Sequence, residues 1–472
     1  MRAADNVAAD GQHSKGNEMR IVVVGAGVVG SHVAERLSGE GHDISIVDAD
    51  ADLVHRLGER MDVMAVAGDA GLPSVLRNAG VEEADLLIAV TQHDTTNLLV
   101  SLMASKMGAK KRIVRVRANE LSSSDSVLSK DDVGADYLIN SQKTTLDLLE
   151  RLVRNPGATD VWEFADGELL LWGYDISDES PLINMKLKDL AENYQDLDAL
   201  IVAIARPDGI VIPTGDDVLL AHDNIYVFIK KTATDDFRRI VHPEKEDIHK
   251  AVISGATRLG IALAERLESS TRSVVLVDPS RDAGEHASRE LRKTMVLCGD
   301  ISEPGFCDEA GLDDIDYFLA LTDDDQANLV NSLLVRKRGG RRIGILAQQP
   351  QFMPILQSLD IDVVVNPRLL IVSSILRHIR KGRILQVSAI GETGAEAREY
   401  LAGKGSSVVG RPIKALGVPR GAILGALFRG DTFVIPRGDT VIEPDDRIVI
   451  FALPEAIEKV ERLFARTGIF KK

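Results

Sequence analysis

Residues 19–48 read MRIVVVGAGVVGSHVAERLSGEGHDISIVD, and this stretch decides the fold of the chain. The apolar run Ile21–Val24 is typical of a buried parallel strand. Across residues 28–37 the apolar side chains recur at helical spacing and share one face. Ile44–Val47 predicts a second strand, which ends at the acid Asp48. The order of strand, helix and strand is that of a β-α-β unit.

Three glycines follow the first strand in the spacing G-x-G-x-x-G. Gly25 permits a tight turn, Gly27 lets a pyrophosphate approach the backbone, and Gly30 lets helix and strand pack closely. The amino end of the helix offers N–H groups and a positive dipole end to phosphate. Asp48, 21 residues after Gly27, can accept hydrogen bonds from a ribose diol, and an acid there disfavours the 2′-phosphate of NADP. The stretch predicts a Rossmann unit for NAD(H) or an adenosine nucleotide; a glycine-rich turn without a ligand is the alternative.

Strands and helices keep alternating up to residue 140. Further strands are expected at 63–67, 86–90, 113–117 and 137–139, and helices at 52–60, 73–79, 95–107 and 121–130. This alternation predicts a doubly wound parallel sheet, in which ligands bind beyond the carboxyl ends of the strands. Four polar side chains fall at or near those ends: Asp48, Asp69, Thr91 and Arg115.

The same pattern returns in the second half of the chain. Residues 250–278 read KAVISGATRLGIALAERLESSTRSVVLVD, so Gly255 follows Gly25 by 230 residues. AVTQHDTTN at 89–97 returns as ALTDDDQAN at 320–328, which is 231 residues later. An offset that changes by only one residue over about 75 residues indicates a duplication.

A smaller repeat follows each Rossmann unit. Residues 212–228, IPTGDDVLLAHDNIYVF, parallel residues 435–451, IPRGDTVIEPDDRIVIF. Turn residues alternate there with short β-branched runs, which predicts β-rich domains. We also expect strands at 200–205 and 423–428 and short helices near 185–192 and 412–416.

The chain is therefore expected to be α/β, with two tandem doubly wound parallel-sheet domains, each followed by a small α+β domain. The expected boundaries are a disordered leader at 1–18, Rossmann domain 1 at 19–140, a crossover helix at 141–155, small domain 1 at 156–234, a charged linker at 235–249, Rossmann domain 2 at 250–366, a crossover helix at 367–382 and small domain 2 at 383–472.

Composition limits the possible partners. The 472 residues carry a formal net charge of −16, which argues against a nucleic-acid partner. No apolar run approaches the roughly 18–20 residues that span a bilayer, so a connection to a membrane is expected to pass through a partner. Cys298 and Cys307 have no helper histidines nearby and are expected to be ordinary thiols of a reducing cytosol.

The sequence resembles the cytosolic regulatory subunits of Trk-type potassium uptake systems (TrkA-like), whose repeating units are called RCK or KTN domains. The resemblance covers residues 19–466 and is carried by GAGVVG with Asp48, GDA at 68–70, AVTQHDTTN, RVR at 115–117 and the two IPxGD segments. It implies binding of NAD(H), possibly ATP or ADP. It also implies a homo-oligomer, a dimer or tetramer, at the inner face of the cell membrane on a potassium-translocating subunit.

The resemblance also implies the residues of each site. At the first site these are Gly25, Ala26, Gly27, Val28, Val29 and Gly30 on the phosphates, Asp48 on the ribose, Thr91 and Gln92 in the pocket, Arg115 on a phosphate, and Asp69 and Ala70 beside them. At the second site they are Gly255, Ala256, Thr257, Arg258, Leu259, Gly260, Asp278, Asp300, Thr322 and Asp323. The second site departs from the pattern, because Thr257 aligns with Gly27 and Ile345 with Arg115. We therefore expect unequal binding.

The alternative function is an NAD-dependent oxidoreductase with duplicated cofactor domains. Such an enzyme needs an acid or base at the nicotinamide, carried by a substrate domain. His93 has no partner placed by the sequence, and the acids at 323–325 are more typical of solvated helix starts than of a metal site. The small domains resemble interface modules more than reaction clefts, which favours a regulator without catalysis.

Overall fold

The structure is a computed structural model. It describes residues 19–123, 126–155, 158–195, 197–207, 209–241, 248–269, 271, 273–349, 352–356, 359, 361–379, 384–390, 394–430 and 432–464. The expected leader at 1–18 lies outside these ranges. The chain forms two compact units, one ending at Asn140 and one beginning at Ser141. No helix in the described ranges is long and apolar enough to cross a membrane.

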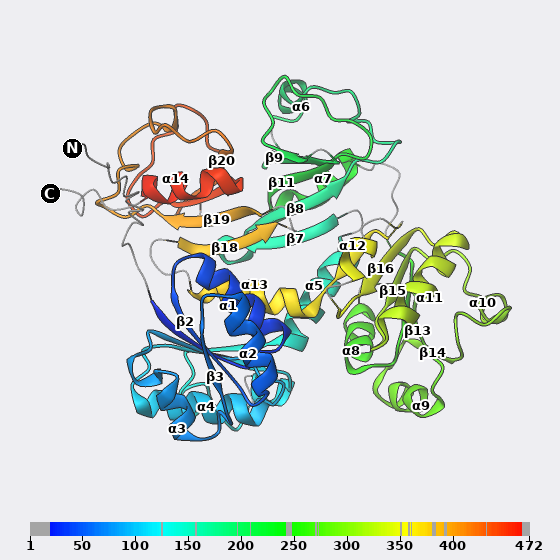
Figure 1. The fold of residues 1–472 in the computed structure, drawn as a ribbon. Helices are drawn as coiled ribbons and strands as arrows, with labels where there is room; N and C mark the ends of the chain where they lie inside the picture. The colour runs from blue at the N-terminus through cyan, green and yellow to red at the C-terminus, as the bar shows by residue number, and fades with distance from the viewer. Residues whose placement is uncertain are drawn as a thin grey trace, which may run out of the picture. The chain divides into compact units, whose positions relative to one another are not determined.

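The first unit is a doubly wound parallel sheet, drawn in blue to cyan in Figure 1. Its strands, in sheet order, are β3 (Met64–Ala67), β2 (Asp43–Asp48), β1 (Arg20–Val24), β4 (Leu86–Ala89), β5 (Arg112–Val116) and β6 (Tyr137–Asn140). Its helices are α1 (Val28–Gly39), α2 (Ala51–Arg60), α3 (Pro73–Asn78) and α4 (Asp94–Met107). The two central strands are β1 and β4, whose side chains are almost all buried. The predicted fold is confirmed.

The second unit contains a parallel sheet with the same strand order. Its strands are β14 (Met295–Cys298), β13 (Ser273–Asp278), β12 (Lys250–Ser254), β15 (Tyr317–Ala320), β16 (Arg342–Leu346) and β17 (Val363–Val365). Its helices are α8 (Arg258–Leu267), α9 (Arg281–Glu290), α10 (Phe306–Glu309), α11 (Asp325–Lys337), α12 (Met353–Leu356) and α13 (Pro367–Ile379). Equal order in both sheets is what a duplication produces.

Two antiparallel sheets of the second unit form the small domains. One has the order β7 (Ala158–Phe164), β8 (Leu169–Asp175), β11 (Asn224–Lys230), β9 (Ala199–Arg206) and β10 (Gly209–Val211), with helices α6 (Leu187–Asn193) and α7 (Thr234–Val241). The other has the matching order β18 (Ile384–Ile390), β19 (Ala395–Leu401), β22 (Arg447–Ala452), β20 (Ala422–Arg429) and β21 (Thr432–Val434), with α14 (Pro454–Phe464).

The two small sheets share one apolar core. Phe164 and Phe228 of one sheet cluster with Phe451 of the other, and all three are buried. A Cβ on Gly425 would lie 2.0 Å from the ring of Phe228, so the glycine leaves room for that ring. The contact between the small sheets is therefore close-packed.

The first crossover helix, α5 (Ser141–Arg154), packs against the second Rossmann domain. Leu149 and Leu152 are buried in a cluster with Leu263 of α8. Arg266 of α8 donates hydrogen bonds to Asp147 (2.6 Å) and Glu150 (2.7 Å) of α5. The apolar stripe of α5 is visible in the sequence, but the surface that covers it is not.

Three expected elements differ in the structure. The helix expected at 121–130 is absent from the described part of that segment, which forms turns after a single 3₁₀ turn at Asn119–Leu121. The backbone N–H and the hydroxyl of Ser129 both donate to Asp132 (2.9 and 2.7 Å), and such local bonds compete with a helix.

The other two differences lie in the small domains. The start of the expected linker is helix α7, whose Phe237 and Val241 are buried in the core of small domain 1. The rest of that linker, 242–247, lies outside the described ranges. The short helix expected near 412–416 is a 3₁₀ turn, Ile413–Ala415.

Candidate functional site

The three glycines of the first half differ in the space around them. Two of them leave no room for a Cβ atom, and the third faces open space. Gly25 has a φ of +105°, and a Cβ there would lie 2.8 Å from the amide nitrogen of Thr91. A Cβ on Gly30 would lie 1.8 Å from the carbonyl oxygen of Gly25. A Cβ on Gly27 would meet nothing within 4 Å. Gly25 and Gly30 are thus required by the fold, whereas the exposed position of Gly27 is open to an approaching group.

The carboxylate of Asp48 holds the glycine loop in place. Its Oδ2 accepts a hydrogen bond from the backbone N–H of Ala26 (2.7 Å), and its Oδ1 accepts one from that of Asp50 (3.0 Å). Asp48 is half-buried at the end of β2. Besides the ribose role that the sequence predicts, it therefore fixes the turn between β1 and α1.

The predicted residues of the first half lie along one edge of the sheet. Asp69 and Ala70 follow β3, Asp48 ends β2, the glycine loop follows β1, Thr91 and Gln92 follow β4, and Arg115 is in β5. Asp69 is exposed, and its Oδ1 accepts from the N–H of Gly71 (2.8 Å). Val28 begins α1, and Val29 is buried beneath it.

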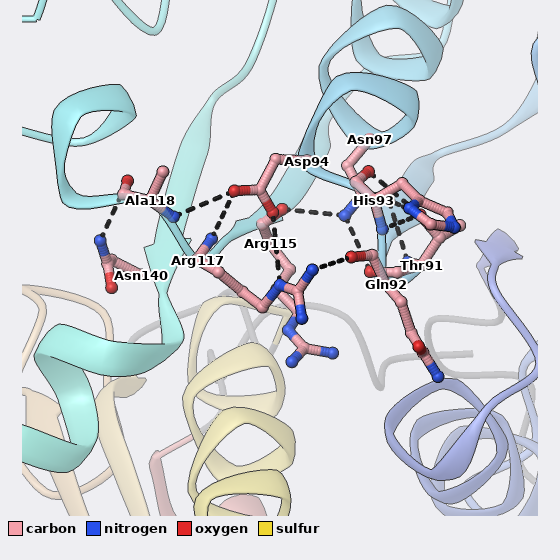
Figure 2. A network of polar contacts seen from close by, with 9 residues as sticks. All are labelled: Thr91, Gln92, His93, Asp94, Asn97, Arg115, Arg117, Ala118 and Asn140. Carbon is pink, nitrogen blue, oxygen red and sulfur yellow. Dashed lines mark hydrogen bonds and ion pairs between the residues drawn. The ribbon is translucent and has the colours of Figure 1, made fainter. Parts of the chain in front are cut away.

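Asn97 joins the ends of β4 and β5, although the sequence did not predict it as a site residue (Figure 2). Its Oδ1 accepts from the N–H (2.9 Å) and the hydroxyl (2.7 Å) of Thr91. Its Nδ2 donates to the carbonyl oxygens of Thr91 (3.1 Å) and Arg115 (3.0 Å). The sequence signal for this role is the repetition of the asparagine at Asn328 in the second half.

A second polar contact places Arg117 beside the same loop (Figure 2). Its Nη2 donates to the carbonyl oxygen of Gln92 (2.6 Å). The N–H groups of Arg117 and Ala118 both donate to Oδ2 of Asp94 (3.0 Å each). Two arginines, Arg115 and Arg117, therefore stand at the strand edge of the first half, where a phosphate would gain from both.

In the glycine loop of the second half, the side chain of Thr257 occupies the position that is open at Gly27. The hydroxyl of Thr257 accepts from the N–H of Gly260 (3.1 Å) and donates to the carbonyl oxygen of Leu321 (3.1 Å). Helix α8 is thus capped by Thr257, whereas Gly27 gives α1 no side-chain cap. The N–H of Gly260, in the first turn of α8, is therefore already bonded within the chain.

The rest of this loop keeps the geometry of the first. Gly255 has a φ of +112°, and Asp278 accepts from the N–H of Ala256 (2.7 Å). Gly260 again packs against the Gly255 carbonyl, where a Cβ would lie 2.0 Å away. Arg258 is exposed, and Leu259 packs against the core. The second half therefore keeps the fold of the loop, but Thr257 takes the place of the open Gly27 position.

The structure corrects the predicted alignment of Arg115 by one residue. Asn328 donates to the carbonyl oxygen of Leu346 (3.0 Å), as Asn97 does to that of Arg115, so Leu346 is the counterpart of Arg115 and Ile345 is not. The register of β15 with β16 agrees, since Ala320 pairs with Ile345 as Ala89 pairs with Val114. One extra residue between β13 and β14 changes the offset from 230 to 231.

The corrected register shows that the second half has lost positive charge at this edge. Leu346 and Gln348 stand where the first half has Arg115 and Arg117, and Asp323 replaces Gln92. Gln348 Nε2 donates to Oδ1 of Asp323 (3.4 Å). Asp324 also replaces His93, so an anionic ligand finds two arginines fewer and two acids more at these positions than in the first half.

The remaining acids of the second half make structural hydrogen bonds. Asp324 caps α11 through the N–H groups of Gln326 (2.8 Å) and Ala327 (3.1 Å). Asp325 accepts from the N–H of Gln348 (2.9 Å), and Asp300 accepts from that of Ser302 (2.8 Å). Thr322 makes the same bonds to Asn328 that Thr91 makes to Asn97. Within the described ranges, no group of three His, Cys, Asp or Glu side chains could hold a metal ion.

Comparison with known families assigns both domain types. The TrkA-N domain matches residues 21–141 and 251–367, and the TrkA-C domain matches residues 173–242 and 397–465. The Trk system potassium uptake protein TrkA of Halomonas elongata is 34% identical over 454 residues, covering 94% of this chain and 98% of that protein. The TrkA homolog of Archaeoglobus fulgidus is 34% identical over 446 residues, covering 94% and 100%.

Two solved structures share the fold. The GsuK RCK domain aligns with a TM-score of 0.61 at 17% identity, covering 98% of each chain. The GsuK channel bound to NAD aligns with a TM-score of 0.60 at 17% identity, covering 95% of this chain and 79% of the other. The order of Rossmann and small domains is thus that of RCK proteins.

Proposed function

Because the chain belongs to the TrkA family of Trk system potassium uptake proteins, we propose that it is a regulatory subunit that binds a nucleotide and gates a membrane potassium-translocating subunit. The observation that carries the nucleotide part is the open loop at Gly27, with Asp48 and two arginines on the same edge. The ligand is NAD(H), or else ATP or ADP. The relatives are Trk system potassium uptake proteins, which favours this function over an oxidoreductase.

The residues of the first half fit such a ligand. Loop N–H groups at the start of α1 and the guanidinium of Arg115 would bind the phosphates, and Asp48 has lone pairs left for the ribose. The bound nucleotide supplies only charge and shape, because no redox step is involved in regulation. It can shift the protein between two states only by its differential affinity, and a tenfold difference is about 1.4 kcal/mol.

The partner that follows from this function is a membrane-embedded potassium-translocating subunit, which this chain would contact at the inner face of the cell membrane. The regulatory subunit would bind it from the cytoplasm and change its transport rate when the ligand changes. The decisive measurement is potassium flux in vesicles that contain a Trk-type membrane subunit, with and without the purified chain. We expect flux to depend on the chain and to change on addition of NADH, NAD⁺, ATP or ADP. A chain that binds nucleotide but never alters flux would contradict the proposal.

Exposed apolar residues at repeated positions support a homo-oligomer. On α4, Leu99 and Leu102 are 46% and 39% exposed, and on α11 their counterparts Val330 and Leu333 are 49% and 36% exposed. Exposed apolar side chains that recur in this way are typical of contact surfaces. We infer that these helix faces join copies of the chain into a dimer or tetramer, the usual closed forms.

Charge placed on these faces is expected to break the oligomer. Leu99→Asp combined with Val330→Asp should lower the mass measured by light scattering to that of a smaller species, because a carboxylate in an apolar contact is costly. Val211→Asp is the matched control, since Val211 is 47% exposed but lies in β10 of a small domain. An unchanged mass for the double variant would refute the assignment of these faces.

A further inference from the structure

We propose that Asn97 is a positioning residue of the first nucleotide site, an inference that rests on the proposed function. Its side chain bonds the backbone of two residues on neighbouring strands, Thr91 after β4 and Arg115 in β5. We call this set of four hydrogen bonds the asparagine bridge. Its effect is to fix the position of the Arg115 backbone relative to Thr91 and the glycine loop.

The asparagine bridge uses every polar site of the amide. The oxygen accepts from two donors of Thr91, and the nitrogen donates to two carbonyl oxygens, so the orientation of the amide is set by chemistry. Asn97 is 0% exposed. A buried amide with all its partners satisfied holds one geometry, because any displacement leaves a buried polar group unpaired.

Thr91 connects the asparagine bridge to the phosphate loop. Its amide nitrogen lies where it would be only 2.8 Å from a Cβ on Gly25, so the backbone after β4 presses against the turn that follows β1. Figure 2 shows Thr91, Asn97 and Arg115 converging at one edge. Asn97 thus ties the strand that carries the arginine to the strand end that supports the loop.

The second half supplies a matched control within the same chain. Asn328 is also 0% exposed and makes the same four bonds, to Thr322 and to the carbonyl oxygen of Leu346. There the bridge positions a leucine instead of an arginine. The two asparagines should therefore contribute alike to folding, while only Asn97 should affect nucleotide affinity at the first site.

The test compares Asn97→Ser with Asn328→Ser in the full chain, by calorimetric titration with NADH and ADP and by thermal unfolding. Both variants should lose similar stability. Asn97→Ser should weaken the tight site by about tenfold or more, and Asn328→Ser by less than about threefold. Asn97→Asp and Asn328→Asp keep the shape and the accepting oxygen but place a second oxygen against the two carbonyl oxygens, so both donated bonds are lost. This second matched pair should show the same contrast in nucleotide affinity.

A double-mutant cycle separates positioning from a general structural role. If Asn97 acts through Arg115, Asn97→Ser should cost less than about threefold once Arg115→Ala is present. The same loss with and without Arg115, an unchanged affinity in both Asn97 variants, or failure of both to fold while the Asn328 variants fold, would overturn the inference. A wild-type chain that binds neither NADH nor ADP would instead overturn the proposed function, and this inference with it.

Discussion

Gly27→Trp should abolish tight nucleotide binding and leave the protein folded. A Cβ at this exposed position would meet nothing within 4 Å, and the φ of −62° at Gly27 is allowed for any residue. The indole would instead occupy the space above the loop. Losing two charge-assisted hydrogen bonds, worth about 1.5–3 kcal/mol each, corresponds to about 100-fold or more in affinity.

The measurement is a titration of the purified variant with NADH, paired with its free energy of unfolding. The free energy of unfolding should stay within about 0.5 kcal/mol of the wild type, as for other surface substitutions. Gly30→Ala is the contrasting control, because its Cβ would lie 1.8 Å from the Gly25 carbonyl and should cost about 1–3 kcal/mol of stability. Wild-type affinity in Gly27→Trp would remove the loop from the binding site.

The two halves should bind nucleotide with clearly different affinities. Thr257 already bonds the N–H of Gly260, and Leu346 and Gln348 replace two arginines. Losing one charged contact to phosphate weakens binding by about 1.5–3 kcal/mol, so the second site should be about 10 to 100 times weaker than the first. Calorimetry of the native chain should show one tight nucleotide per chain before any second one.

A pair of substitutions at Thr257 checks the cause. Thr257→Gly frees the N–H of Gly260 and should strengthen the weak site, at a cost of a few tenths of a kcal/mol in stability. Thr257→Ser keeps the hydroxyl and should change neither quantity. Two equal and independent sites in the native chain would show that neither the cap nor the missing arginines matter.

Local sequence patterns predicted the parts of the site that lie within one β-α-β unit. The roles of Gly25 and Gly30 follow from spacing alone, and the structure adds only which atoms they would touch. Asn97 was missed as a site residue because its partners belong to two strands, and spacing does not show which side chain reaches both. The counterpart of Arg115 was misplaced by one residue because the offset of 230 was applied to it, although the repeat at residues 89–97 already has an offset of 231.

Packing between distant segments was beyond the sequence for the same reason. Periodicity shows that α5 has an apolar stripe, but the residues that cover it, such as Leu263, are more than 100 positions away. The prediction of a helix at 121–130 was wrong because serines there form local hydrogen bonds, such as that of Ser129 with Asp132. A count of apolar positions does not detect such bonds.

The shared core of the two small sheets makes their pairing insensitive to dilution. Phe228 fills the space left by Gly425, and both residues belong to one polypeptide. Two separate chains would lose translational and rotational freedom on forming such a contact, at an estimated cost of about 4–15 kcal/mol. Fusion replaces that concentration-dependent loss with a fixed effective concentration. The chain therefore keeps this sheet-to-sheet contact at any protein concentration.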